Sequence, residues 1–376
     1  GPATGCSLRE AIQSVNGAAD YGGCTNTGVG YGTSDTINIP AGTCTIAING
    51  AADELLNATG SFDILKNVTI VGAGAGSTTI DGGGLDRVFA INGVITVSIS
   101  GVTITNGLSG GGSGINSNVA TLIVNNSTIS NNTATSGATG GGGILTTTGG
   151  SLTVNNSTIS GNSAGSWGGG IMAWGPLTVN NSTISGNTAG SYGGGIFRGA
   201  SGAGASTFTN STISANSAPN GGGIWNDGGG TVPLTNTIVA NQTSGADCFN
   251  VATNGHNLES ATSCGFTGTG DLQNTDPLLG ALASNGGPTQ TMALSVGSPA
   301  IDAGDNAICA AAPVNGVDQR GIVRPQGSAC DIGAYEYATA TSIPTLSEWA
   351  QIGMVALLLG GGLLAIRRKR QRLVIG

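Results

Sequence analysis

Charged side chains and aromatic rings are scarce in this sequence. Asp, Glu, Lys and Arg together make up only 8% of the 376 residues and Phe, Trp and Tyr only 4%, whereas 70 residues are glycine. A compact enzyme domain usually carries about a quarter charged residues, so this composition is unusual for one. With few rings available, the core must be built from Ile, Val, Leu and Ala, which suit flat stacked layers. Such a composition makes internal repeats the first feature to look for.

Basic residues are nearly absent from most of the chain. Only six lie in residues 1–366, and the last ten residues contain Arg367, Arg368, Lys369, Arg370 and Arg372. The net charge is −8, so the body is acidic. Binding to nucleic acid phosphates requires clustered Lys and Arg. We therefore expect no nucleic-acid partner.

The seven cysteines form no CxxC pair, which makes a zinc site or a thioredoxin-like site improbable. They lie toward the two ends, with none between residues 45 and 247. This distribution is typical of disulfides in an oxidising compartment. We predict the pairs Cys24–Cys44, Cys248–Cys264 and Cys309–Cys330, with Cys6 left over. Because the chain starts without Met or a signal peptide, we expect residue 1 to be a processed or truncated start.

Residues 1–60 begin with a pattern typical of a short helix. Ser7 and Glu10 have the spacing of a capping box, and one helical face would carry Leu8, Ala11, Ile12 and Val15. A solenoid needs a cover over its terminal coil, where core and strand edge are otherwise open. We predict that this segment is an N-terminal helical cap.

Residues 61–250 repeat a short unit. Segments such as LIVNNSTISNN and LTVNNSTISGN recur at spacings of 30, 25, 29 and 25 residues, with equivalent isoleucines at Ile129, Ile159, Ile184, Ile213 and Ile238. GGGI falls between them and ends at Ile144, Ile171, Ile196 and Ile224. Each unit therefore holds at least two short strands separated by turns rich in Gly or Asn.

One coil of a parallel β-helix fits this unit. Alternation places Ile159 inward and places Thr158 and Ser160 outward. Asparagines at fixed offsets would stack into a ladder at a turn, formed by Asn132, Asn162, Asn187, Asn216 and Asn241. We predict an all-β fold, a single right-handed parallel β-helix of the pectate-lyase type. About eight coils would give a rod on the order of 40 Å long.

The C-terminal tail, residues 338–376, has the pattern of a membrane segment. A linker (338–342) precedes IPTLSEW (343–349), an apolar run (352–366) and the basic cluster. Together with Trp349 and Ala350 the apolar stretch has about 18 residues, near the lower limit for a spanning helix. Trp349 would lie at the outer interface, while the stop-transfer residues Arg367, Arg368, Lys369 and Arg370 mark the cytoplasmic side. We predict a C-terminal transmembrane helix with the body outside.

Three stretches resemble known families. CSLREAI, beginning at Cys6, resembles the CSLREA domain of bacterial surface β-helix proteins. Residues 276–337, with DPLLGAL, NGGPTQTMAL, GSPAIDAG and DIGAYE, resemble the choice-of-anchor Q domain, so we interpret residues 251–337 as a C-terminal cap. The tail resembles the IPTL-CTERM sorting signal of Gram-negative bacteria. That resemblance implies recognition by an exosortase-type membrane enzyme, with cleavage near Ile343–Leu346. The sorting signal consists of Ile343, Pro344, Thr345, Leu346 and Trp349. None of the three families implies catalytic residues.

Groups able to perform catalysis are few. A glycoside hydrolase needs two carboxylates roughly 5–10 Å apart, and a lyase needs a base and often calcium. Between Val88 and Asn226 the sequence offers only Arg198. Asp81 and Asp86 are interpreted as turn residues or, alternatively, as a small acidic site. The richest charged group is either an ion-pair network that locks the C-terminal cap or a site for Ca²⁺ or glycan carboxylates, and it contains Asp302, Asp305, Asp318, Arg320, Arg324, Asp331 and Glu336.

We therefore predict no resident cofactor, with Ca²⁺ as the one candidate ion, and no catalytic residue. The predicted function is that of an exported, non-catalytic structural or adhesive protein at the surface of a Gram-negative cell, contacting glycans, matrix or other surface proteins. End-to-end association into a fibre is a variant of it. The alternative is a polysaccharide lyase or glycoside hydrolase. A minor alternative is binding of ice or crystal surfaces by outward Thr-x-Ser rows, namely Thr128/Ser130, Thr158/Ser160, Thr183/Ser185 and Thr212/Ser214.

Overall fold

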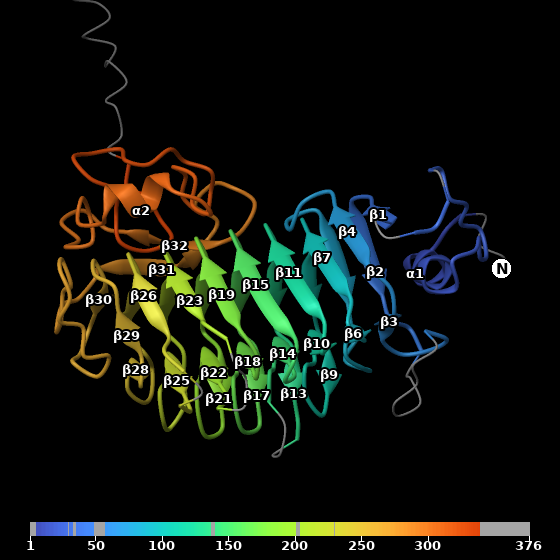
Figure 1. Ribbon diagram of the computed structural model, residues 1–376, viewed down its shortest axis with the longest axis horizontal. Coiled ribbons are helices and arrows are strands. Elements are labelled where there is room, and N and C mark those ends of the chain that lie inside the picture. The colour runs from blue at the N-terminus through green and yellow to red at the C-terminus, as the bar shows by residue number, and fades with distance from the viewer. Residues whose placement is uncertain are drawn as a thin grey trace, which may run out of the picture. The chain divides into compact units, whose positions relative to one another are not determined.

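The computed structural model describes residues 5–28, 30–32, 35–48, 57–136, 140–200, 204–228 and 230–338. All of them up to Tyr337 belong to one compact unit, built mainly of short parallel strands that stack coil upon coil (Figure 1). The predicted β-helix is confirmed, because each strand pairs in parallel with the equivalent strand of the next coil.

Three sheets run along the coils. The first contains β1 (Asp35–Ile39), β4 (Val68–Gly72), β7 (Thr96–Ser100), β11 (Thr121–Asn125), β15 (Ser151–Asn155), β19 (Leu177–Asn180), β23 (Thr207–Thr209), β26 (Pro233–Thr235) and β29 (Ala252–Thr253). The second contains β3 (Phe62–Ile64), β6 (Phe89–Asn92), β10 (Ile115–Asn118), β14 (Ile144–Thr146), β18 (Ile171–Ala173), β22 (Ile196–Arg198), β25 (Ile224–Asn226) and β28 (Cys248–Phe249). The third contains β2 (Gly42–Thr45), β5 (Thr78–Asp81), β8 (Thr103–Thr105), β12 (Thr128–Ser130), β16 (Thr158–Ser160), β20 (Thr183–Ser185), β24 (Thr212–Ser214), β27 (Ile238–Ala240) and β30 (Leu258–Glu259). A small fourth sheet contains β9 (Leu108–Ser109), β13 (Thr133–Ala134), β17 (Ser163–Ala164) and β21 (Thr188–Ala189).

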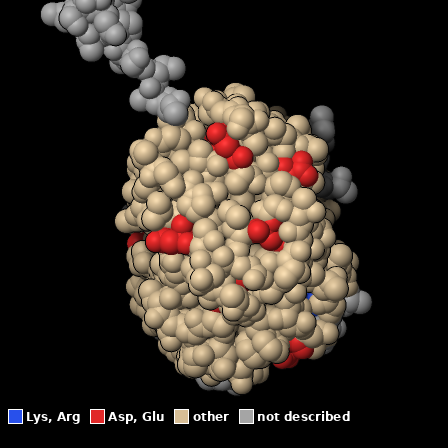
Figure 2. All heavy atoms as spheres, turned by 90° about the vertical axis from the view of Figure 1, so that its left-hand side faces the viewer, with Lys and Arg blue, Asp and Glu red and all other residues tan. Residues whose placement is uncertain are grey.

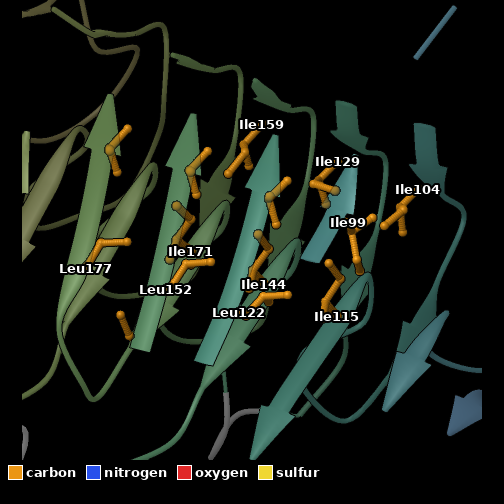
Figure 3. Packing of buried hydrophobic residues seen from close by; sticks show 14 of the residues in the cluster. Ile99, Ile104, Ile115, Leu122, Ile129, Ile144, Leu152, Ile159, Ile171 and Leu177 are labelled. Atoms are coloured by element: carbon orange, nitrogen blue, oxygen red, sulfur yellow. The ribbon is translucent and has the colours of Figure 1, made fainter. Parts of the chain in front are cut away.

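Rows of inward-facing Ile, Leu and Val side chains fill the interior (Figure 3). Ile104, Ile129 and Ile159 belong to one such row on the third sheet, and all three are fully buried. Full burial of an aliphatic side chain of this size stabilises a fold by roughly 1.5–3 kcal/mol. The near-absence of rings in the sequence is thus matched by thin, stacked aliphatic layers.

Asparagine marks the turn between the first and third sheets. The Asn of NST, or its counterpart in the last repeat, has a left-handed backbone with φ between 46° and 49°, at Asn126, Asn156, Asn181, Asn210 and Asn236. Asn tolerates this conformation better than most side chains because its short polar group bonds locally. The repeated Asn-Ser-Thr sequence therefore encodes a turn followed by a strand.

A buried amide ladder runs along the next turn. The side-chain nitrogen of Asn132 donates to Asn162 Oδ1 at 2.9 Å, Asn162 donates to Asn187 at 2.9 Å, and Asn187 donates to Asn216 at 3.0 Å. These four predicted positions are confirmed. The fifth prediction, Asn241, is wrong: Asn216 donates instead to Gln242 Oε1 at 3.3 Å.

The ladder continues at Gln242 and not at Asn241, and the predicted isoleucine register is wrong by the same one residue in this coil. Ile129, Ile159, Ile184 and Ile213 do pair in sequence along the third sheet. Ile213, however, pairs with Val239, while Ile238 pairs with Thr212. The reason lies in the preceding turn, where Thr237 takes the place of the serine Ser211 of the previous coil: each hydroxyl donates to the backbone carbonyl two residues earlier.

Replacing Asn187 by alanine is expected to lower the free energy of unfolding by about 2–3 kcal/mol. The Asn187 amide bonds both neighbouring rungs as well as the Ile159 carbonyl, and its removal leaves buried polar groups without partners. Urea unfolding measures the change. Asn220, an exposed amide that donates only to Ser191 O, is the matched control. Equal losses for Asn187→Ala and Asn220→Ala would contradict a stabilising role for the ladder.

The predicted N-terminal cap is confirmed as helix α1 (Leu8–Gly17) with a complete Ser7–Glu10 capping box. Ile12 and Val15 are buried against the first coil, and the Arg9 guanidinium bonds the Asn57, Gly60 and Ser61 carbonyls there.

The predicted Cys24–Cys44 disulfide is wrong. Cys24 pairs with Cys6, because the helix and the turn after it bring their Cα atoms to 4.5 Å. Cys44 is instead fixed on β2, opposite Ile80 of β5, and is free. The predicted pairs Cys248–Cys264 and Cys309–Cys330 are confirmed.

The C-terminal segment covers a side of the coils. It contains the antiparallel hairpin β31 (Leu279–Ala283) and β32 (Thr291–Leu294) and the short helix α2 (Asn306–Ala310), which lie beside the later coils in Figure 1. Residues 252–259, predicted to belong to the cap, form β29 and β30 and so continue the coils.

The predicted transmembrane helix lies outside the described residues, as do the sorting residues and the basic cluster of the tail. Among the residues that are described, no helix is long and apolar enough to cross a membrane.

Candidate carbohydrate-binding surface

The two aspartates of the early coils serve as turn residues. Asp81 accepts hydrogen bonds from the Gly83 N–H at 2.7 Å and from the Asn106 side chain at 3.1 Å. Asp86 accepts from the N–H groups of Ser61 and Arg87. Of the two sequence interpretations, the turn role is the one these bonds favour.

The charged residues of the C-terminal segment do come together, as an ion-pair network. Arg320 contacts Asp318 at 2.7 Å, and Arg324 lies 3.8 Å from Glu336 with both side chains fully buried. Arg324 also donates to the carbonyls of Asp331 and Gly333.

The remaining members of the group have local structural partners. Asp305 caps α2, and Asp302 accepts from the Ala329 N–H. The His256 Nδ1 atom lies at hydrogen-bond distance, 2.8 Å, from the carbonyl oxygen of Ala303 in the same segment as Asp302 and Asp305. The arrangement matches the predicted lock. In the described part of the chain, no three His, Cys, Asp or Glu side chains are grouped to hold a metal ion such as Ca²⁺.

Burial dominates the acid–base behaviour of this network. The Asp331 carboxyl is only 1% exposed, and burial raises its pKa to about 7. Burial also raises the pKa of Glu336 and of two buried carboxyls in the last coils, Asp247 and Glu259. Each of these four carboxyl groups accepts a hydrogen bond from a backbone N–H, so each has a structural partner inside the protein.

The hydroxyl rows predicted to face outward are mostly covered. Thr158 donates to the Gln290 carbonyl, Thr183 donates to the Gln319 side chain, and Thr212 accepts from the Ala334 N–H. Of the four Thr-x-Ser pairs, only Thr128 and Ser130 keep partial exposure. The prediction of an exposed array for an ice or crystal surface is therefore wrong, because the C-terminal segment lies over it.

A row of large apolar side chains lies on the outer face of the second sheet. In successive coils the residue after the inward isoleucine, or after Cys248 in the last coil, is paired with its neighbour in register. The row contains Leu145, Met172, Phe197, Trp225 and Phe249. Outward positions of a sheet normally carry polar side chains, so five apolar ones in line are unusual. Leu145, Met172 and Phe197 are buried under neighbouring side chains, whereas Trp225 is half-buried and Phe249 is exposed.

Further rings flank this row and complete the aromatic surface, a name we use for Trp167, Trp174, Tyr192, Phe197, Trp225 and Phe249. They are six of the fifteen aromatic residues in the chain and include three of its four tryptophans. Trp167 and Tyr192 stand just before the glycine run that precedes β18 and β22, and they pair with each other across coils.

The rings form two stacked pairs, and a further ring contacts each pair: Trp174 meets the first edge-on, and Tyr192 is tilted against Trp225 of the second. Trp167 and Phe197 are stacked with centroids 5.4 Å apart, and Trp225 and Phe249 with centroids 4.0 Å apart. Trp174 meets Phe197 edge-on at 6.0 Å. Phe249 stays 47% exposed, because β28 is the last strand of the second sheet. Stacked and edge-to-face arrangements are those that aromatic pairs prefer, and Tyr and Trp are enriched where part of the ring is apolar and part faces water.

Sequence reasoning missed this surface although a signal was present. The residue after each GGGI isoleucine is apolar in four coils (Leu145, Met172, Phe197 and Trp225), where the alternation of a strand calls for a polar one. Because the sequence has few rings, their concentration on and beside the second sheet was not noticed.

The coils, the registers and the buried aliphatic rows define a parallel β-helix protein. The family model described as right handed beta helix region matches residues 55–244, and the chain belongs to that family. The IPTL-CTERM motif matches residues 341–372, so the chain is a β-helix surface protein with a C-terminal sorting motif. Its resemblances to the CSLREA and choice-of-anchor Q domains stay predictions.

Among solved structures the chain is similar to one titled "Crystal structure of pectate lyase Pel9A". The two are 15% identical, with a TM-score of 0.46, and the match covers 80% of this chain and 87% of the other. No curated protein matches the sequence.

Proposed function

We propose that the protein is a non-catalytic binding protein displayed at the cell surface, which attaches to polysaccharide through the aromatic surface. The observation that carries this proposal is the gathering of six rings from consecutive coils on and beside the second sheet, all of them except Phe197 partly exposed. The C–H faces of sugar rings are flat and apolar, and aromatic side chains are the groups that pack best against them.

The surroundings of the aromatic surface favour binding over cleavage. Hydrolysis requires two carboxyl groups on either side of the glycosidic bond. In the coils between Val88 and Asn226 the only charged side chain is Arg198, which is 1% exposed and donates to Ser206 and Asn226. Asp227, just beyond Trp225, is a single carboxylate and can serve as a hydrogen-bond acceptor for sugar hydroxyls.

The C-terminal tail supports display outside the cell. In this proposal an exosortase-type enzyme recognises Ile343–Leu346 and the apolar run holds the protein in the membrane until it is processed. The confirmed disulfides fit an oxidising compartment outside the cytoplasm.

Incubation of the protein with a panel of neutral and acidic polysaccharides tests this function. The full chain, kept soluble in mild detergent because of the apolar run 352–366, is expected to co-sediment with at least one polymer. It should release neither reducing ends nor unsaturated products. Products that disappear in Asp81→Asn, Asp227→Asn or Asp318→Asn variants would establish the alternative, a lyase or hydrolase.

A further inference from the structure

We propose that the ligand is a neutral polysaccharide whose chain lies along the row of rings, parallel to the axis of the coils. The inference rests on the proposed function and narrows it to one class of polymer. It excludes polyuronates and other polyanions as ligands of the aromatic surface.

The distribution of charge carries the first step. Residues 1–366 hold nineteen acidic and six basic residues. Four of those six are already engaged: Arg198 and Arg324 are buried, Arg320 pairs with Asp318, and Arg9 bonds the first coil. Acidic side chains are prominent on the end of the β-helix that carries the last coils (Figure 2).

A polyanion would therefore approach a surface of its own sign. Lys66 and Arg87 are the remaining cations of the described residues, and they belong to the early coils, far in sequence from the rings. Recognition of carboxylates or sulfates normally uses Arg or Lys in direct contact with the anion. Within the described residues, the outward row of the second sheet contains no Arg or Lys that could contact an anion. A neutral polymer can therefore bind there without electrostatic repulsion from the acidic protein.

The register of the row supports the direction of the chain. Its members are separated by one coil, and parallel strands lie about 4.8 Å apart. A sugar unit in an extended polysaccharide is of similar length, so consecutive units can meet the partly exposed rings of consecutive coils, Tyr192, Trp225 and Phe249, which contact one another in that order.

Polar groups border the rings. Asn220, next to Tyr192 in the neighbouring coil, and Asp227 are both exposed, and they offer an amide and a carboxylate to sugar hydroxyls. A row of apolar contacts with a few polar neighbours is the usual composition of a ligand site.

Affinity measurements with the full chain test the ligand class. Soluble xylan, glucomannan and mixed-linkage β-glucan serve as neutral probes, with polygalacturonate and alginate as acidic ones. We expect binding to at least one neutral probe, tightening with oligosaccharide length until the row is filled, and at least tenfold weaker binding to both acidic ones.

Ring variants locate the site. Phe249→Ala and Trp225→Ala are each expected to weaken binding about tenfold, as loss of a central aromatic anchor does. Trp225→Phe should retain most of the affinity. Tyr21→Ala is the matched control, because Tyr21 is 52% exposed but lies in the N-terminal cap region. Melting temperatures establish that all variants are folded.

Each outcome decides a separate point. Preference for the acidic probes, with loss in the ring variants, would overturn the neutral ligand and leave the proposed function standing. Neutral binding that the ring variants and Tyr21→Ala reduce equally would overturn the location on the aromatic surface. Absence of binding to every probe by the wild-type chain would overturn both proposals.

Discussion

The Arg324→Met variant is expected to unfold with about 3–5 kcal/mol less free energy than the wild-type protein. Arg324 is the central cation of the C-terminal network, and its removal leaves the buried Glu336 and Asp331 carboxyls without the positive charge that faces them. Two backbone carbonyls, of Asp331 and Gly333, also lose their donor. Urea unfolding at neutral pH measures the loss.

Arg87→Met is the control for this variant, because Arg87 is partly exposed and its replacement should cost less than about 1 kcal/mol. The loss of unfolding free energy in Arg324→Met should be smaller at acidic pH. There Glu336 and Asp331 are protonated and uncharged, so removal of the cation leaves no buried negative charge unpaired. A deficit that is equal at acidic and alkaline pH, or no larger than that of Arg87→Met, would contradict the assignment of the network as a lock.

The wild-type protein is expected to lose stability as the pH rises from about 4 to about 7. Burial raises the pKa of Asp331 from 3.8 to about 7 in the folded state, so the folded protein binds this proton more tightly than the unfolded chain does. The stabilising contribution is therefore fully present below the unfolded pKa and is lost as the pH rises through the folded one. Asp331 alone accounts for about 4 kcal/mol, and Glu336, Asp247 and Glu259 shift in the same direction.

Unfolding midpoints across this pH range measure the effect, and Asp331→Asn should flatten the dependence. Asp302→Asn is a suitable control, since Asp302 is an exposed carboxylate of the same segment. Stability that increases with pH between about 4 and 7, or an unchanged slope in Asp331→Asn, would show that the buried carboxyl does not retain its proton in the folded protein.

Repetition made most of the fold predictable. The in-register isoleucines and the first four asparagines of the ladder follow from spacing alone, because neighbouring coils repeat the same local chemistry. The prediction failed at the last repeat, where Thr-Ile-Val resembles Thr-Ile-Ser one residue out of register. Only the turn shows the difference, since Thr237 there takes the place of Ser211 and Gln242 extends the ladder with its longer side chain.

Features that depend on contacts between residues far apart in the sequence could not be predicted from the repeat pattern. The C-terminal segment covers the hydroxyl rows through bonds such as Thr183–Gln319, which joins residues 136 positions apart. Nothing in the strand pattern distinguishes a hydroxyl that faces water from one that faces another segment. The Cys6–Cys24 pair likewise depends on how α1 and the turn after it bring two cysteines together.

The charged group of the C-terminal segment was identified correctly as a group, and the ion-pair interpretation given for it agrees with the contacts. The aromatic surface could have been predicted from the sequence but was missed. Its residues Phe197, Trp225 and Phe249 lie in register with one another, and they break the expected polar outward position in coil after coil. Departures from a pattern that recur at one repeat position therefore mark a surface whose role is to be tested, as the pattern itself marks the fold.

Tryptophan fluorescence during titration with a neutral oligosaccharide is the most direct test of the central claim. Three of the four tryptophans belong to the aromatic surface, so binding there should change the emission in a saturable way, and Trp225→Phe should reduce that change. The account predicts saturation with no release of new reducing ends. An emission that is unaffected by every neutral polymer that the protein co-sediments with, or steady formation of cleaved products, would contradict it.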